Sequence, residues 1–202
     1  ADGDVAALRP GLEPAIPVVA LEGLVLRDPG YDLISEIAAA CIDEIRAIQP
    51  HGPYRIAGFS FGGHVAGAIA CRLEAMGERV ELLLILDTAV RLDAVPLRPA
   101  GGMARLMAAG RRHGWRVYGG RATLVRTWER PLRHLGTPGL GWEYIATGGV
   151  AVFDLPTTHW GLIAPPFADR LAEIVAGLLG QRLDVPQPDI LLPHTPLPDA
   201  LH

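Results

Sequence analysis

The sequence is poor in cysteine and contains no long hydrophobic run. Its 202 residues hold two cysteines, Cys41 and Cys71, both in helix-like segments. A disulfide framework is therefore excluded as the basis of the fold, and we expect a reducing, cytoplasmic location. No apolar stretch approaches the ~20 residues that a membrane-spanning helix needs, and the N-terminus lacks the pattern of a signal peptide. We therefore expect no membrane partner.

The sequence also lacks an excess of basic charge. Lysine and arginine total 18 against 22 aspartate and glutamate residues, so the net charge is −4. A nucleic-acid-binding domain usually carries a basic surface that neutralises phosphates, so this balance argues against a nucleic-acid partner. Half of the residues are apolar, which excludes a disordered chain, and 202 residues suit one domain with a substantial core.

What the sequence does contain is an alternation of strand-like and helix-like segments. Short apolar runs predict buried strands at residues 16–21, 54–59, 80–87, 122–127 and 150–155. Apolar residues at three-to-four spacing predict helices at residues 31–50, 62–76 and 165–179. This order is typical of an α/β fold whose mostly parallel sheet has helices on both faces.

Two regions interrupt this alternation. Residues 89–120 contain helical patterns and loops and are too long for a simple connection, so we expect a helical insertion there. Residues 181–202 are rich in proline and show no period, which predicts a tail that lies on the surface or is disordered. We therefore expect one domain over residues 1–180, followed by this C-terminal tail.

The segment "RIAGFSFGGHVAGAIACRL" places Ser60 between a strand-like run and a helix-like run. A serine nucleophile on an α/β sheet is held at a sharp turn of this kind, where the residues two positions away must be small. Gly58 and Gly62 meet this requirement. The helix N-terminus would favour a developing oxyanion, with the backbone N–H of Phe61 as one donor. We therefore interpret Ser60 as a nucleophile.

A serine nucleophile needs a base and an orienting acid, and in this architecture the chain order is serine, acid, histidine. His159 follows the last strand-like run by a short loop, which favours it as the base. His64 lies on the helix after the serine, where we expect it to be packed or half-exposed. Asp87 ends the run "LLLILD" and is the preferred acid, while Glu129 follows the next strand and is the competing candidate.

These motifs resemble those of the thioesterase domains that end nonribosomal peptide synthetase and polyketide synthase assembly lines, members of the α/β-hydrolase superfamily. The resemblance covers residues 5–179 and is most specific in "IQPHGPYRIAGFSFGGHVAGAIACRLEAMGERVELLLILDTA". It extends to "GRATLVRT" and "LGWEYIATGGVAVFDLPTTHWGLI". The resemblance implies that Ser60 is the acylated nucleophile, Asp87 the orienting acid and His159 the base.

The resemblance also implies a substrate and a partner. The substrate would be an acyl or peptidyl thioester on the phosphopantetheine arm of a carrier protein, in cis or in trans, and the domain itself would bind no cofactor. The chain would pass to the serine and leave by hydrolysis or macrocyclisation. Residues 89–120 correspond to the family's lid, where Arg111 and Arg112 would meet the carrier or the phosphate and Trp115 would help to cover the acyl chain. The alternative is a solvated amphipathic helix.

The N-terminus departs from the family pattern. Family members begin with a strand and a loop that supplies the second oxyanion donor, whereas "ADGDVAAL" resembles only the end of that loop. We therefore expect the first strand or strands to be missing from this chain, and we assign the second donor to the backbone of Ala1. Near the base, Thr157 and Thr158 replace a glycine-containing pair that is frequent in the family.

The residues leave two alternatives to chain release. One is a stand-alone type II editing thioesterase, in which the acid often lies one strand later, at Glu129. The other is a catalytically impaired hydrolase-fold module that binds a carrier or another partner, which the missing first strand motivates. Chain release is the preferred hypothesis. The ordered blocks around Ser60 and Asp87 separate the resemblance from general lipases, which would share only the G-x-S-x-G pentapeptide.

Overall fold

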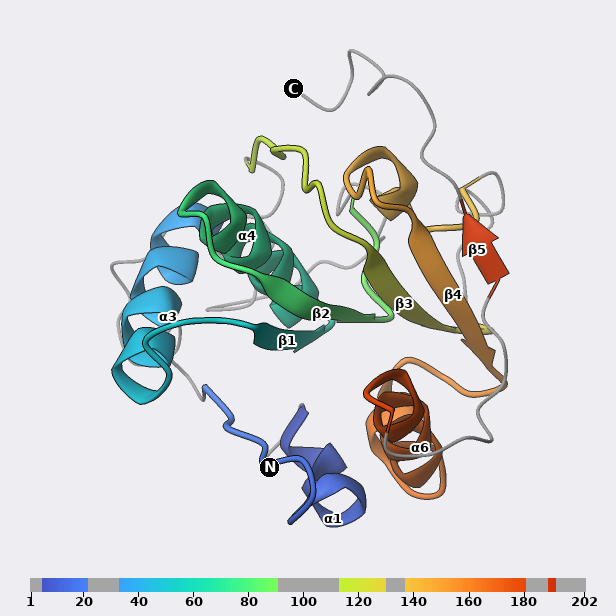
Figure 1. The fold of residues 1–202 in the computed structure, drawn as a ribbon. Helices are drawn as coiled ribbons and strands as arrows, with labels where there is room; N and C mark the ends of the chain where they lie inside the picture. The colour runs from blue at the N-terminus through green and yellow to red at the C-terminus, as the bar shows by residue number, and fades with distance from the viewer. Residues whose placement is uncertain (1–4, 22–32, 91–112, 130–136, 181–188, 192–202) are drawn as a thin grey trace.

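The computed structural model describes residues 5–21, 33–90, 113–129, 137–180 and 189–191. Within these ranges the chain forms a sheet with the strand order β1-β2-β3-β4-β5 (Figure 1). Its strands are β1 (Tyr54–Phe59), β2 (Val80–Leu86), β3 (Ala122–Thr127), β4 (Val150–Leu155) and β5 (Asp189–Leu191). The first four are parallel, and β5 pairs antiparallel with β4. The predicted α/β fold with a mostly parallel sheet is therefore confirmed.

The parallel register brings the carboxyl ends of neighbouring strands to one edge of the sheet. Phe59 at the end of β1 pairs with Leu86 at the end of β2. The ends of β3 and β4 are also in register with each other. Ser60 and Asp87 follow β1 and β2 directly, so they lie at the same edge, where ligands bind in open α/β sheets.

Helices cover both faces of the sheet (Figure 1). On one face lie α3 (Ile34–Ile48) and α4 (Phe61–Ala75), which contact each other, and α4 also contacts β1 and β2. On the other face, α1 (Arg9–Leu12), which follows the 3₁₀ helix η1 (Val5–Leu8), packs against α6 (Phe167–Leu178). Each face has its own buried apolar cluster. The helices are held by apolar burial, which contributes about 1.5–3 kcal/mol for each large side chain.

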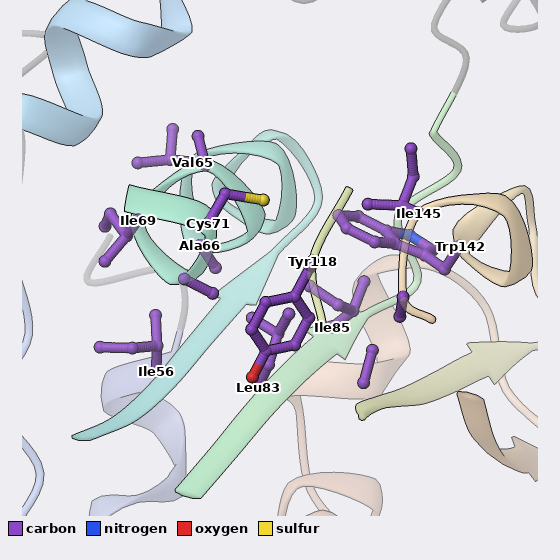
Figure 2. Packing of buried hydrophobic residues seen from close by; sticks show 14 of the residues in the cluster. Ile56, Val65, Ala66, Ile69, Cys71, Leu83, Ile85, Tyr118, Trp142 and Ile145 are labelled. Atoms are coloured by element: carbon purple, nitrogen blue, oxygen red, sulfur yellow. The ribbon is translucent and has the colours of Figure 1, made fainter. Parts of the chain in front are cut away.

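The cluster beneath α4 fixes this helix against β1 and β2 (Figure 2). Buried side chains from the two strands and from α4 meet there, and Figure 2 labels Ile56, Leu83, Ile85, Val65, Ala66 and Ile69 among them. Close approach requires a small residue in α4, because a Cβ on Gly67 would lie 2.7 Å from Trp142. Packing of α4 therefore fixes its N-terminus, and with it the turn at Ser60.

Three predicted strands agree with the structure residue for residue: β1, β3 and β4. Glycines follow the ends of two helices: Gly77 after α4 has a φ of +80°, and Gly180 after α6 has a φ of +73°. A residue with a Cβ is disfavoured in this left-handed conformation, whereas glycine adopts it readily. Glycine at these positions therefore sets where each helix stops.

The predicted strand at residues 16–21 is wrong, because these residues have no regular secondary structure. Pro17 has no N–H with which to join a sheet ladder. Side chains occupy the backbone groups of Val18 instead: its N–H donates to Glu13 Oε1 (3.3 Å), and its carbonyl accepts from Arg9 Nε (3.2 Å). An apolar composition was therefore not sufficient to place this segment in the sheet.

Most of the expected helical insertion, including Arg111 and Arg112, lies outside the described residues. Its final part, residues 113–120, is described and is not helical. Trp115 in this part is buried, and its ring lies 5.0 Å from that of Trp142. The expectation that Trp115 covers an acyl chain is therefore wrong, because it belongs to the protein core.

The expected tail after Gly180 contributes to the sheet. Its residues Asp189–Leu191 form β5, in which Asp189 pairs with Val152 and Leu191 with Val150 of β4. We did not predict this strand, because three residues among prolines carry no readable alternation. The sheet therefore includes residues from both sides of the predicted boundary at residue 180.

Neither cysteine forms a disulfide, and both are buried in helices. Burial raises the pKa of the Cys41 thiol and of the Cys71 thiol to about 11 each, with smaller contributions from neighbouring glutamates. Both thiols are therefore protonated near neutral pH and act as apolar packing groups. Of the helices that the structure describes, none is long and apolar enough to cross a bilayer.

Candidate active site

Ser60 lies at the sharp turn between β1 and α4. Its φ of 54° and ψ of −123° are rarely adopted by residues with a Cβ, so the turn is strained in the manner of a nucleophile elbow. The Ser60 N–H donates to the carbonyl of Leu86 (3.0 Å), and the Gly63 N–H donates to the carbonyl of Ser60 (3.1 Å). The first bond joins the elbow to the end of β2, directly before Asp87.

The glycines around Ser60 have different steric roles. A Cβ on Gly58 would overlap the backbone of Gly62, and a Cβ on Gly63 would overlap the side chain of Thr88. A Cβ on Gly62 would meet no atom within 4 Å. The predicted need for a small residue is therefore confirmed at Gly58 and wrong at Gly62, and Gly63 is the second sterically constrained position.

Two buried side chains support the backbone of the elbow. Thr88 Oγ1 donates to the carbonyl of Ser60 (2.7 Å), and Trp142 Nε1 donates to the carbonyl of Thr88 (2.7 Å). Both side chains are shielded from water. Thr88 Oγ1 also lies 3.1 Å from the carbonyl of Leu86, so this hydroxyl ties the elbow to the end of β2. Loss of the bond from Trp142 would leave a buried indole N–H without this acceptor, so the two side chains together stabilise the strained conformation of Ser60.

Asp87 and His159 are in direct contact at the sheet edge. His159 Nδ1 lies 2.8 Å from Asp87 Oδ2. The Asp87 side chain is 8% exposed and the His159 side chain is 27% exposed. Because a carboxylate only accepts, Nδ1 is the donor, and the neutral imidazole presents Nε2 as an acceptor. This is the tautomer that a general base needs.

Thr127, the last residue of β3, holds the carboxylate of Asp87 through both oxygens. Its N–H donates to Oδ1 (2.8 Å), and its Oγ1 donates to Oδ2 (2.9 Å). Together with the bond from His159, the carboxylate accepts three hydrogen bonds. These bonds compensate for lost hydration and fix the direction in which the carboxylate meets the imidazole.

Phe59 connects His159 to the elbow. Its ring stacks on that of His159 with centroids 4.6 Å apart, and the ring of Trp160 contacts both edge-on. Ser60 follows Phe59 directly, so one peptide joins the candidate nucleophile to the ring that supports His159. The described side chains of Ser60 and His159 share no hydrogen bond. In unliganded enzymes such bonds are often long and tighten when substrate is bound.

The remaining candidates have other surroundings. Glu129 Oε2 accepts a hydrogen bond from the backbone N–H of His159 (3.1 Å). Asp154, within β4, pairs with Arg126. Phe61 is the first residue of α4, so its N–H has no acceptor inside the helix. Ala1, the expected second oxyanion donor, lies outside the described residues.

His64 is buried rather than half-exposed, and within the described part of the chain neither of its ring nitrogens has a hydrogen-bond partner. The rings of Phe61 and Trp115 lie 6.0 and 5.7 Å from it. Burial lowers the pKa of His64 to about 3, with a smaller contribution from His113. His64 is therefore neutral at physiological pH and is enclosed by aromatic rings rather than by partners for proton transfer.

Three supporting residues were not predicted: Phe59, Thr88 and Thr127. Two of them had a local signal, because Phe59 precedes the candidate nucleophile and Thr88 follows the candidate acid in "LLLILDT". Thr127 had no such signal, since its contact with Asp87 depends on the pairing of β2 with β3 across 40 residues of sequence. Strand pairing of this kind is set by tertiary structure.

Comparisons with known proteins place this site in a family context. Residues 12–107 match a family model described as "Thioesterase domain". The predicted resemblance to assembly-line thioesterase domains is confirmed. A stretch of 93 residues is 40% identical to non-reducing polyketide synthase terA of Aspergillus terreus. A stretch of 84 residues is 37% identical to a dimodular nonribosomal peptide synthase of Bacillus subtilis. These stretches are 45% and 41% of this thioesterase-like chain but 4% of each synthase.

Solved structures of thioesterase domains share the fold. One is the NocB thioesterase domain in covalent complex with a fluorophosphonate nocardicin G analog, which is 24% identical in sequence. The match has a TM-score of 0.66 and covers 88% of this chain and 90% of that one. The Vlm2 thioesterase domain is 22% identical with a TM-score of 0.59, over 76% of each chain. At these identities the likeness shows the fold, so the roles of individual residues depend on the geometry described above.

Proposed function

We propose that this chain is a chain-releasing thioesterase that accepts an acyl or peptidyl chain from the phosphopantetheine thioester of a carrier protein. The observation that carries the proposal is the Asp87–His159 hydrogen bond, 2.8 Å long, at the sheet edge that also holds the Ser60 elbow. The family match supports the thioester class of the substrate. The contacts of the described side chains support the assignment of roles.

In the first half-reaction, Ser60 Oγ attacks the thioester carbonyl carbon while His159 Nε2 accepts the hydroxyl proton. The N–H of Phe61 would donate to the carbonyl oxygen as negative charge develops there. When the tetrahedral intermediate collapses, the carbon–sulfur bond breaks and His159 returns the proton to the departing thiolate. The products are an ester on Ser60 and a free thiol on the phosphopantetheine arm.

In the second half-reaction, water or an amine or hydroxyl of the bound chain attacks the ester. His159 accepts the proton of this nucleophile and returns it to Ser60 Oγ as the ester bond breaks. Water gives a free acid, and an internal nucleophile gives a ring. In both half-reactions the Asp87 carboxylate stabilises the imidazolium that forms on His159.

The partner of His159 also bears on the choice between chain release and editing. His159 Nδ1 is hydrogen-bonded to Asp87, which directly follows β2, the first strand after α4. Glu129, which follows β3, contacts the backbone of the same histidine. The editing alternative places the acid at Glu129. The observed contacts therefore favour Asp87 and, with it, chain release.

The two serines of the sequence, Ser60 and Ser35, provide a matched test. We expect Ser60→Ala to lower kcat/KM for an acyl N-acetylcysteamine thioester by about 10³-fold or more, and to abolish covalent labelling by a fluorophosphonate. Ser35 is exposed on α3, so Ser35→Ala should behave as the wild type. Mass spectrometry of the labelled protein reads out the modified residue, and unchanged turnover in Ser60→Ala would refute the mechanism.

A further inference from the structure

Two residues that directly follow β3 hold the loop that carries the proposed base. The backbone N–H of Trp128 donates to the carbonyl of Thr157 (3.3 Å). The carboxylate of Glu129 accepts from the backbone N–H of His159 through Oε2 (3.1 Å). Trp128 and Glu129 are the two residues after Thr127, which holds the proposed acid. One strand end therefore restrains the acid and the base loop together.

The other contacts of this loop order its far side. Thr158 Oγ1 accepts from the N–H of Gly161 (3.1 Å), and the Thr158 carbonyl accepts from the N–H of Leu162 (3.2 Å). These bonds start the 3₁₀ helix η4 (Trp160–Ile163) and do not involve the N–H of His159. Among the described residues, the acceptor of that N–H is Glu129.

We propose that Glu129 is a positioning residue that fixes the backbone of His159, and that it is not the acid of the triad. The inference rests on the proposed function of Ser60 and His159. Nδ1 of the imidazole is bonded to Asp87, so the ring already has its carboxylate. A base that shifts by a fraction of an ångström loses alignment with its nucleophile, which is why a backbone restraint affects turnover.

The exposure of Glu129 separates this role from a contribution to overall stability. Its side chain is exposed at the surface, where polar interactions add little to the free energy of unfolding. A charged acceptor nevertheless forms a stronger hydrogen bond to a backbone N–H than a neutral one does. Loss of Glu129 should therefore change kcat more than it changes the unfolding temperature.

Three substitutions in the full chain test this role: Glu129→Ala, Glu129→Gln and, as a control, Glu81→Ala. Glu81 is an exposed glutamate near the start of β2, at the opposite end of the strand from Asp87, and pairs with Arg55. We expect Glu129→Ala to lower kcat for a small acyl thioester about tenfold with little change in KM. Glu129→Gln keeps a carbonyl acceptor and should stay within about threefold of the wild type. Glu81→Ala should leave kcat unchanged.

Amide hydrogen exchange at His159 gives a second readout that a general structural role would not move. The His159 N–H should exchange faster in Glu129→Ala than in the wild type and should stay protected in Glu129→Gln, with unfolding temperatures alike. Wild-type kcat and wild-type protection in Glu129→Ala would overturn the positioning role. A loss in Glu129→Gln as large as that in Asp87→Asn would instead identify Glu129 as the acid. Failure of the wild type to label at Ser60 would overturn the proposed function, while the exchange data would still report the contact.

Discussion

His159 and His64 both follow Ser60 in the chain, and each contacts the ring of a residue next to Ser60: Phe59 for His159 and Phe61 for His64. Their ring nitrogens nevertheless differ in hydrogen bonding. His159 is 27% exposed on its side chain and bonded to Asp87. His64 is buried among Phe61 and Trp115, with both nitrogens unpaired. The difference shows that a position near Ser60 in the sequence does not give a histidine the contacts that a general base needs. An acceptor for Nδ1–H and an accessible Nε2 are what the role requires.

The largest expected effect contrasts the two histidines directly. We expect His159→Ala to lower kcat/KM for a small acyl thioester by about 10⁴-fold or more, because the proton acceptor is lost. His64→Leu, which has a similar size and leaves no unpaired polar atom, should stay within about threefold of the wild type. Steady-state kinetics on both variants checks this prediction. A comparable loss of activity in the two variants would show that their different contacts do not give the two histidines different roles.

A smaller effect concerns stability at acidic pH. The pKa of His64 is about 3 in the folded chain, against an ordinary value of 6.5. Between these values the unfolded chain binds a proton that the folded chain excludes, so stability falls as the pH falls below about 6.5. We expect His64 to account for about 2 kcal/mol of destabilisation between pH 7 and pH 5.

Urea unfolding of wild type and His64→Leu at both pH values measures this difference. The acid-induced loss of stability should be smaller in His64→Leu, since His113 and all other titrating groups are present in both proteins. An equal acid-induced loss in wild type and His64→Leu would show that the burial of His64 does not govern the pH dependence.

The smallest expected effect concerns Thr127, whose hydroxyl donates to Asp87, the partner of His159. Thr127→Val removes the hydroxyl that donates to Asp87 Oδ2 and keeps the backbone donor to Oδ1. We expect kcat to fall about tenfold, because the carboxylate loses one of its directing bonds. Thr127→Ser restores the hydroxyl and should recover most of the activity. Equal activity in the two variants would show that the hydroxyl is dispensable.

The sequence predicted the elements of this site better than it predicted the contacts between them. Periodicity located β1, β3 and β4, and the elbow motif located the strained turn at Ser60. The ends of successive parallel strands identified Asp87, and the loop after the last predicted strand identified His159, which the structure brings into contact. Such features are local, so one sequence is enough to read them.

The errors arise where tertiary contacts override local pattern. Residues 16–21 are apolar, yet Pro17 and side-chain bonds to Val18 keep them out of the sheet. The three residues of β5 are too short to show a period and form a strand because they pair with β4. Glu129 suited the role of an acid by its position in sequence, but its observed bond is to the backbone of His159.

The stacking of Phe59 on His159 has a consequence for how the elbow and the base move. Phe59 ends β1 and is 4% exposed, so its ring is anchored in the core as firmly as the strand itself. Any displacement of this strand end carries the serine hydroxyl and the floor beneath the imidazole in the same direction. A displacement of β1 would therefore move Ser60 and the ring on which the His159 imidazole packs as one unit.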